Sequence, residues 1–178
     1  GTHAGLAIGK DGVTQMGLED VSLMRAIPNM KVFQPATSNQ SIQMMKDIVK
    51  TDGPSYLRIG RQPIPECFTL EEDIELGKAQ VIKDSEDADI CFVTSGCILH
   101  DVKEAADILT SQGNKVSILN FHTIKPFDES TLEKFAKRSK VVITVEDHSV
   151  VGGLGSLVCE SLSQNYPSRV LRIGLEDT

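Results

Sequence analysis

Three side chains that could bind a polar ligand are spaced along the glycine-rich segment at the start of this sequence. His3, Asp11 and Gln15 are separated by eight and then by four residues. A histidine can donate to a phosphate or a sugar hydroxyl, a carboxylate can accept from a hydroxyl, and an amide can do either. These residue types indicate a loop that binds a polyol. A loop held together by its own side-chain hydrogen bonds is the alternative.

Two arginines, Arg58 and Arg61, lie near the end of a segment that we expect to form a strand. A guanidinium group can hold a phosphate through two parallel hydrogen bonds. Ligands of open α/β sheets gather at the carboxyl ends of the strands. The two arginines are therefore a candidate phosphate clamp, and pairing with nearby acids is the alternative.

Two further motifs lie at the end of a later predicted strand. Gly152-Gly-Leu-Gly155 precedes a predicted helix, whose free N–H groups could bind a phosphate, but a third glycine at the required step is absent. We expect a tight turn and close helix packing there instead. Glu146-Asp-His148 could relay protons, but adjacent side chains diverge along a strand, so we favour a structural or interface role.

Hydrophobic patterns predict that helices and strands alternate around these residues. The elements expected in the first third are a helix at 18–28, a strand at 31–34, a helix at 39–50 and a strand at 55–59. The second helix carries Ile42, Met45 and Val49 on one face. Prolines and an acidic run then mark residues 62–76 as a semi-extended interdomain linker.

The alternation resumes after the linker. Strands are expected at 78–82, 90–94, 116–119, 141–145 and 170–173, and helices at 100–112, 129–139 and 152–165. The strand at 90–94 is almost wholly apolar, which is typical of a parallel strand covered on both faces. We therefore predict an α/β fold with two three-layer αβα domains, residues 1–61 and 77–178. Both sheets should be mainly parallel, the second being a smaller five-strand sheet.

Composition narrows the possible partners. The net charge of -7 argues against binding to nucleic acid or to a membrane surface. No apolar run approaches the roughly 20 residues that a spanning helix needs. The four cysteines show no CxxC or zinc-ligand spacing, so we expect free thiols and a cytoplasmic location.

Several motifs resemble, in collinear order, the pyrimidine-binding and C-terminal domains of transketolase. They are Gly1-Thr-His-Ala-Gly5, Gly9-Lys-Asp-Gly12, Leu18-Glu-Asp20, Arg58-Ile-Gly-Arg61, Phe121-His-Thr-Ile-Lys-Pro126 and Val145-Glu-Asp-His148 with Gly152-Gly-Leu-Gly155. The resemblance spans essentially the whole chain. It implies a thiamine-diphosphate and Mg²⁺-dependent transferase of the pentose phosphate pathway, which moves a two-carbon ketol unit between sugar phosphates.

The resemblance also implies roles for individual residues. His3 and Arg61 match family residues that bind the substrate phosphate, and Asp11 matches the aspartate that contacts the hydroxyl beside the donor carbonyl. Gln15 stands where many transketolases have a histidine near the thiazolium, so it is expected to lie beside the cofactor. Lys10 stands where acidic residues are frequent in the family, which slightly changes the charge around Asp11.

The family's activating glutamate and its main cofactor and metal contacts are expected outside this segment, which begins without a methionine inside a loop. We therefore expect no catalytic or metal-binding residue here, and a chain that is inactive alone. The expected partner is a second copy or an N-terminal transketolase subunit. Deoxyxylulose-phosphate synthase, the beta subunit of a 2-oxo-acid dehydrogenase, and a non-catalytic dimerisation or regulatory fragment remain the alternatives.

Overall fold

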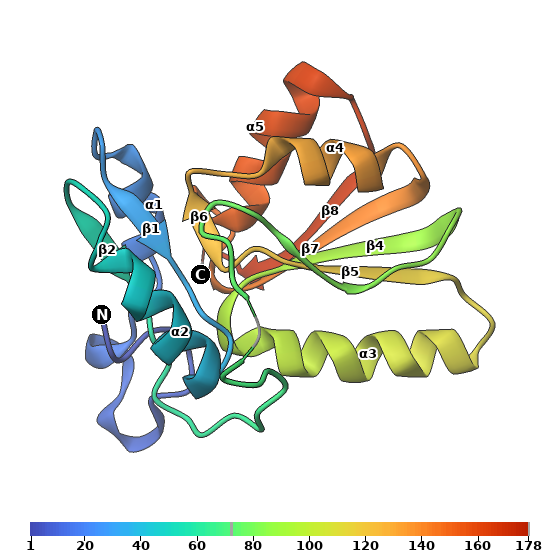
Figure 1. Cartoon of the computed structure of the whole chain (residues 1–178). Coiled ribbons are helices and arrows are strands. Elements are labelled where there is room, and N and C mark those ends of the chain that lie inside the picture. The colour runs from blue at the N-terminus through green and yellow to red at the C-terminus, as the bar shows by residue number, and fades with distance from the viewer. Residues whose placement is uncertain (72, 178) are drawn as a thin grey trace.

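The chain forms two sheets with helices packed on them (Figure 1), as seen in a computed structural model that describes residues 1–71 and 73–177. The strand orders are β2-β1-β6 in the first sheet and β3-β5-β4-β7-β8 in the second. The predicted α/β class and the five strands of the second sheet are confirmed. The second sheet is the larger of the two and not the smaller, because the described residues supply only three strands to the first, one of them antiparallel.

The first sheet is assembled from distant parts of the chain. β1 (Lys31–Phe33) pairs in parallel with β2 (Ser55–Leu57) and antiparallel with β6 (Thr123–Lys125). Two helices belong to this part of the chain, α1 (Asp20–Ala26) and α2 (Ser38–Ile48). The sequence patterns did not predict β6, which is paired with a strand that lies far from it in the sequence.

The helix α2 begins where the sequence predicts but buries a different face. Thr37 caps it by accepting a hydrogen bond from the Gln40 amide at 3.3 Å. The apolar residues Ile42, Met45 and Val49 are 50%, 41% and 70% exposed. The buried face of the helix consists of Gln40, Gln43, Met44 and Ile48. Periodicity alone misplaced this face, because the buried glutamines find hydrogen-bond partners elsewhere in the chain: Gln40 Nε2 donates to Gln80 Oε1 at 2.6 Å and Gln43 Nε2 donates to the Thr69 carbonyl at 2.8 Å.

The second sheet forms the middle layer of a three-layer unit (Figure 1). The parallel strands are β4 (Ala88–Thr94), β5 (Val116–Asn120), β7 (Ser139–Ser149) and β8 (Val170–Leu175), with β3 (Gln80–Lys83) antiparallel at one edge. A short turn η3 (Gly96–Ile98) leads into α3 (Leu99–Ser111), which covers one face. The helices α4 (Glu129–Ala136) and α5 (Leu154–Asn165) cover the other.

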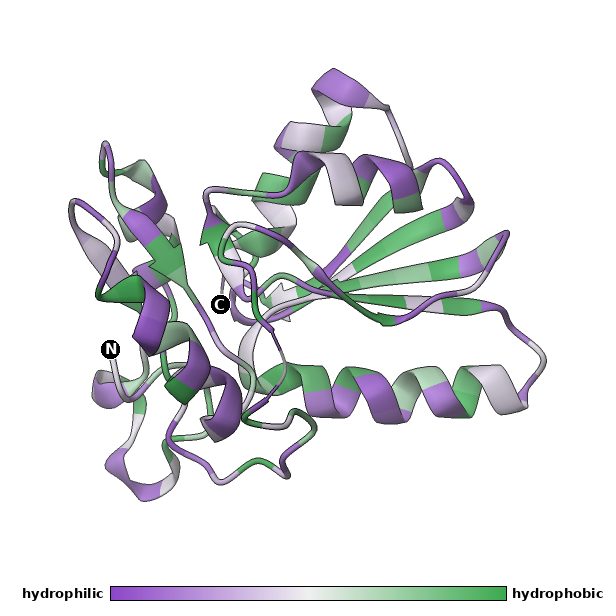
Figure 2. Ribbon diagram, in the orientation of Figure 1, coloured by the Kyte–Doolittle hydropathy of each residue, from purple (hydrophilic) through white to green (hydrophobic). Residues whose placement is uncertain are grey.

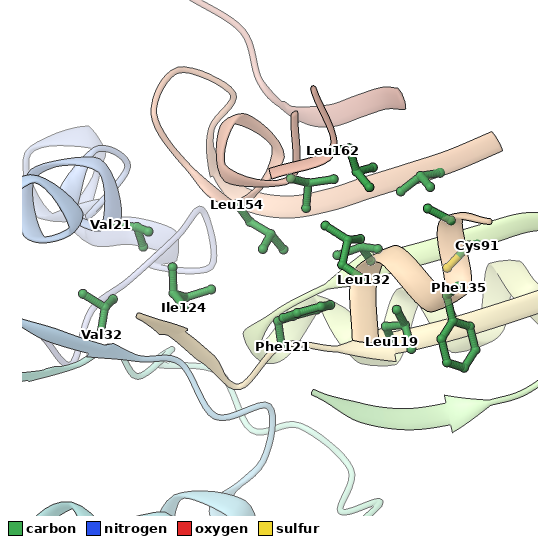
Figure 3. Close-up of a cluster of buried hydrophobic side chains, with 14 residues drawn as sticks. Val21, Val32, Cys91, Leu119, Phe121, Ile124, Leu132, Phe135, Leu154 and Leu162 are labelled. Atoms are coloured by element: carbon green, nitrogen blue, oxygen red, sulfur yellow. The ribbon is translucent and has the colours of Figure 1, made fainter. Parts of the chain in front are cut away.

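One apolar core joins the two sheets. Val32 from β1 and Ile124 from β6 belong to the same buried cluster as Phe121, Leu132 and Leu154 (Figure 3). The strands of the second sheet are the most continuously apolar part of the molecule (Figure 2). Burial of this area is the main stabilising term for such a fold. The shared core therefore fixes the first sheet against the second.

The segment expected to be a linker lies against α2. Within 62–76, the described residues form no helix or strand. Phe68 is buried, its carbonyl accepts from Asn39 Nδ2 at 2.9 Å, and the Thr69 carbonyl accepts from Gln43 Nε2 at 2.8 Å. These contacts give acceptors to the side-chain amides of Asn39 and Gln43 on α2.

Candidate functional site

The glycine-rich opening segment folds over the end of β2. Ala4 forms parallel bridges with both Gly17 and Gly60. The Gly5 amide donates to the Gly17 carbonyl at 3.0 Å, and the Gly17 amide donates to the His3 carbonyl at 3.2 Å. The loop between Ala4 and Gly17 contains two short turns, η1 (Gly9–Asp11) and η2 (Val13–Gln15). We call residues 1–17 the site loop.

His3 and Gln15 line one pocket of about 330 Å³, together with Thr14, Asp20 and Tyr56. Both predicted residues are exposed. The Nδ1 atom of His3 lies 3.0 Å from the Thr2 hydroxyl, which can hold the ring in one orientation. The structure therefore brings together two of the four predicted binding residues, facing solvent and a common space.

Asp11 and Arg61 form an ion pair with each other. Their side chains are 45% and 46% exposed, and Arg61 also donates to the Ile8 carbonyl at 3.4 Å. Exposed ion pairs contribute only about 0–1 kcal/mol, so this one leaves both groups able to exchange partners. Sequence spacing gave no sign of the pair, since the two residues are 50 positions apart.

The bridge between Ala4 and Gly60 connects the segment that carries His3 with the segment that carries Arg61. His3 immediately precedes one bridged residue and Arg61 immediately follows the other. A histidine ring and a guanidinium group therefore flank the same backbone contact. Arg61 does not itself line the pocket of His3 and Gln15, so the bridge between Ala4 and Gly60 is what links Arg61 to that pocket.

Arg58 has a different role from the one the sequence suggested. It is 1% exposed, and its Nε donates to the Asp20 carboxylate at 3.0 Å. One terminal nitrogen donates to Asp147 Oδ1 at 2.7 Å, and the other donates to the carbonyls of Gly17 at 2.8 Å and Asp147 at 3.1 Å. The clamp reading is therefore wrong for Arg58, because its donors already bind the protein.

Electrostatics reinforce this buried cluster. Burial opposes the charge of Arg58, but the carboxylates of Asp147 and Asp20 raise its pKa above the usual value. Burial and the neighbouring Asp20 also raise the pKa of Tyr56 to about 12, and its hydroxyl donates to Asp20 at 2.8 Å. The acids in Leu18-Glu-Asp20 and Glu146-Asp-His148 were the available sequence signal for partners of Arg58.

The carboxylate of Glu146 lies at the start of α5, the position at which the free N–H groups of the helix could otherwise bind a phosphate. Its carboxylate accepts from the Leu154 amide at 2.7 Å and from the Gly155 amide at 2.9 Å. A Cβ on Gly153 would overlap this carboxylate and would lie 2.7 Å from His148 Nδ1. The glycine motif therefore serves close packing around an internal acid, as expected.

Glu146 should make stability depend on pH. Burial raises the pKa of Glu146 from 4.5 to about 7, although the two amide donors favour the charged form. Between these values the unfolded chain releases this proton while the folded chain keeps it. The stabilisation from Glu146 is thus complete below the unfolded pKa and is lost as the pH rises through the folded pKa.

The variant Glu146→Gln isolates this contribution. The free energy of unfolding of the natural chain minus that of the variant should fall from pH 4.5 to about 7 and then level off. His148, whose pKa is lowered by burial, acts in the opposite direction but is present in both proteins. Urea unfolding at a series of pH values measures the difference. A constant difference would contradict the assignment.

The described residues show neither a membrane-spanning helix nor a cluster of metal ligands. No helix within 1–71 or 73–177 is long and apolar enough to cross a membrane. No group of three or more His, Cys, Asp or Glu side chains there is arranged to hold a metal ion. Cys91, Cys97 and Cys159 are free thiols, and Cys91 is buried.

Comparison with known proteins places the whole chain in one family. The model of the transketolase pyrimidine-binding domain matches residues 1–66, and that of the transketolase C-terminal domain matches residues 77–178. A 6-deoxy-6-sulfo-D-fructose transketolase subunit from Clostridium sp. strain MSTE9 is 37% identical over 99% of this chain and 54% of its own length. A putative transketolase C-terminal section from Methanocaldococcus jannaschii is 36% identical, with coverage of 99% and 55%.

Solved structures agree with these relatives. A split-gene transketolase, described as an inactive β4 tetramer, superposes with a TM-score of 0.90 at 37% identity and covers 99% of this chain and 56% of that one. A Campylobacter jejuni transketolase gives a TM-score of 0.72 at 25% identity, with coverage of 99% and 26%. The chain spans about half the length of the curated subunits that it matches. The chain belongs to the transketolase family.

Proposed function

We propose that this chain is the part of a transketolase that holds the sugar phosphate during transfer of a two-carbon ketol unit from a ketose phosphate to an aldose phosphate. The observation that carries the proposal is the site loop. It places His3 and Arg61 on either side of one backbone bridge and Gln15 in the adjoining pocket. The resemblance of the motifs to the family supports a phosphate-binding role for His3 and Arg61, and Gln15 stands where many transketolases have a histidine near the thiazolium.

Arg61 and His3 bind the phosphate in this proposal. A doubly charged phosphate attracts Arg61 more strongly than a single exposed carboxylate does. Binding therefore releases Arg61 from Asp11. The freed Asp11 carboxylate then accepts from a sugar hydroxyl and discriminates against the epimer, which leaves the carboxylate unpaired. Phosphate binding at one end of the sugar positions the bond that breaks at the other.

The pocket fits a polar group of the cofactor or of the sugar. Gln15 presents an amide that can donate or accept in the pocket that His3 also lines. When bound, thiamine diphosphate supplies the carbanion that adds to the ketose carbonyl and takes up the electron pair of the broken carbon–carbon bond. Gln15 orients the reacting groups by hydrogen bonding. The diphosphate, its Mg²⁺ and the activating glutamate belong to regions outside residues 1–178.

The proposed partner is an N-terminal transketolase subunit or the N-terminal part of a longer chain, with a second copy completing the assembly. The names of several relatives describe them as subunits or sections of transketolases. The similar split-gene protein is described as inactive when it forms a β4 tetramer. We therefore infer that the chain alone does not catalyse ketol transfer. The free thiols of Cys91, Cys97 and Cys159 fit the reducing cytoplasm.

The test is an assay of the complete assembly with thiamine diphosphate, Mg²⁺, xylulose 5-phosphate and ribose 5-phosphate. We expect ketol transfer by the assembly and none by this chain alone. A parallel reaction with pyruvate and an aldose phosphate tests the synthase alternative, and one with a branched 2-oxo acid tests the dehydrogenase alternative. Turnover in either parallel reaction without ketol transfer would overturn the proposal.

A further inference from the structure

The second sheet has a topological switch point that faces the site loop. Chain order passes from β4 to β5 on one side and then to β7 on the other side of β4. In open α/β sheets, ligands bind at such a point, outside the carboxyl ends of the strands. Thr94 pairs with Val145, so Asp147 lies just beyond the end of β4, and Cys97 lies in the turn that follows β4.

Parts of the chain from around the first sheet occupy this position. The buried guanidinium of Arg58 binds both the carboxylate and the carbonyl of Asp147. Gln34, which follows β1, is 6% exposed, and its Nε2 lies 3.4 Å from Asp147 Oδ1. A Cβ on Gly96 would lie within 2.8 Å of the Gln34 side chain. The position where such sheets take a ligand is thus filled by the protein itself.

The site loop and the turn that carries Arg61 both pack against this switch point, at Asp147 and Cys97. A Cβ on Gly5 would overlap the Asp147 carboxylate, and one on Gly60 would lie 2.6 Å from Cys97 Sγ. The Gly17 carbonyl accepts from Arg58, which Asp147 holds. These three glycines lie two residues after His3, one before Arg61 and two after Gln15. Each proposed binding residue is therefore close in the chain to an anchor on the switch point.

We propose that Asp147 is a positioning residue, through which the C-terminal sheet sets where His3, Gln15 and Arg61 lie. Asp147 does not line the pocket of His3 and Gln15. It acts through two residues: Gly5, which lies against its carboxylate, and Arg58, which donates to it. This inference rests on the proposed function for its kinetic part. Its structural part, the anchoring of the site loop, is testable without turnover.

The variant Gly5→Ala pushes the site loop away from Asp147, and Gly113→Ala is its control. Both glycines have positive φ angles, 78° and 91°, so alanine strains the backbone at either position. Gly113 has no heavy atom within 4 Å of the added Cβ. The control therefore reports backbone strain remote from the site. The variant Asp147→Ala, alone and combined with Gly5→Ala, completes the set.

Kinetics of the complete assembly should separate the variants. Displacement of a positioning contact by an ångström can cost about a hundredfold. We expect Gly5→Ala to raise the KM for ribose 5-phosphate by about tenfold or more, with a smaller change for ribose, because the phosphate contacts move. Gly113→Ala should change neither the KM for ribose 5-phosphate nor the KM for ribose. The double variant should be less impaired than the product of the two single effects, since both act on one contact.

Hydrogen–deuterium exchange of the same assembly tests the anchoring separately. Asp147→Ala should speed exchange at the amides of Gly5 and Gly17, and Gly113→Ala should not. If Gly5→Ala fails to fold, Asp147→Ala provides the kinetic test through the ratio of the KM for ribose 5-phosphate to the KM for ribose. Unchanged exchange together with an unchanged ratio would overturn the proposal. Faster exchange in an assembly whose natural form transfers no ketol unit would support the anchor and contradict the proposed function.

Discussion

Replacing Arg58 with methionine is expected to lower the free energy of unfolding by about 3–5 kcal/mol. The substitution leaves the carboxylates of Asp20 and Asp147 without their shared cation, in surroundings where the arginine side chain is 1% exposed. It also removes the donors to the Gly17 and Asp147 carbonyls. Unpaired charges and unsatisfied carbonyls in a buried site are among the most destabilising changes known.

The matched control is the same substitution at Arg61. That residue also pairs with an aspartate, but at the surface, so Arg61→Met should cost less than about 1 kcal/mol. Urea unfolding followed by circular dichroism measures both variants. Equal losses would show that the buried network does not carry the stability assigned to it.

Arg61→Ala is expected to raise the KM for phosphorylated sugars by about ten- to a hundredfold in the complete assembly. A charged hydrogen bond contributes about 1.5–3 kcal/mol, and each 1.4 kcal/mol is a factor of ten. Because the side chain is half exposed, little packing is lost with it. The effect should therefore appear in binding of the phosphate and not in stability.

Lys50→Ala is the control for loss of one exposed cation. Lys50 pairs with Asp47 at 2.8 Å with 72% of its side chain exposed, and neither residue lines the pocket of His3 and Gln15. Steady-state kinetics with ribose 5-phosphate and with ribose should show an effect of Arg61→Ala on the phosphate ester alone. A KM for ribose 5-phosphate that does not change would remove Arg61 from the site.

The strongly patterned elements could be predicted from the sequence. The apolar run at 90–94 became β4 at the centre of the second sheet, and the helix expected at 100–112 became α3 (Leu99–Ser111). In both, local hydrophobic periodicity and burial agree. The same reasoning failed for α2, whose apolar face is exposed while Gln40 is fully buried. Hydrogen bonds from distant segments reversed the pattern there.

Long-range pairing was beyond the sequence. Nothing local indicates that Thr123–Lys125 joins β1, or that Asp11 and Arg61 meet across 50 positions. Arg58 and Arg61 are three residues apart and of one type, yet one is buried in a network and the other is half exposed. Residue type gave both arginines the same candidate role, and only tertiary contacts separate the buried structural arginine from the half-exposed one that we propose to bind phosphate.

The most direct measurement follows a labelled two-carbon unit through the complete assembly. The natural protein receives xylulose 5-phosphate labelled with ¹³C at C1 and C2, together with thiamine diphosphate, Mg²⁺ and either ribose 5-phosphate or ribose. The account predicts a labelled seven-carbon sugar, which carries a phosphate only when ribose 5-phosphate is the acceptor, and a much lower KM for ribose 5-phosphate than for ribose. Absence of label in any product, or equal KM values for the two acceptors, would contradict it.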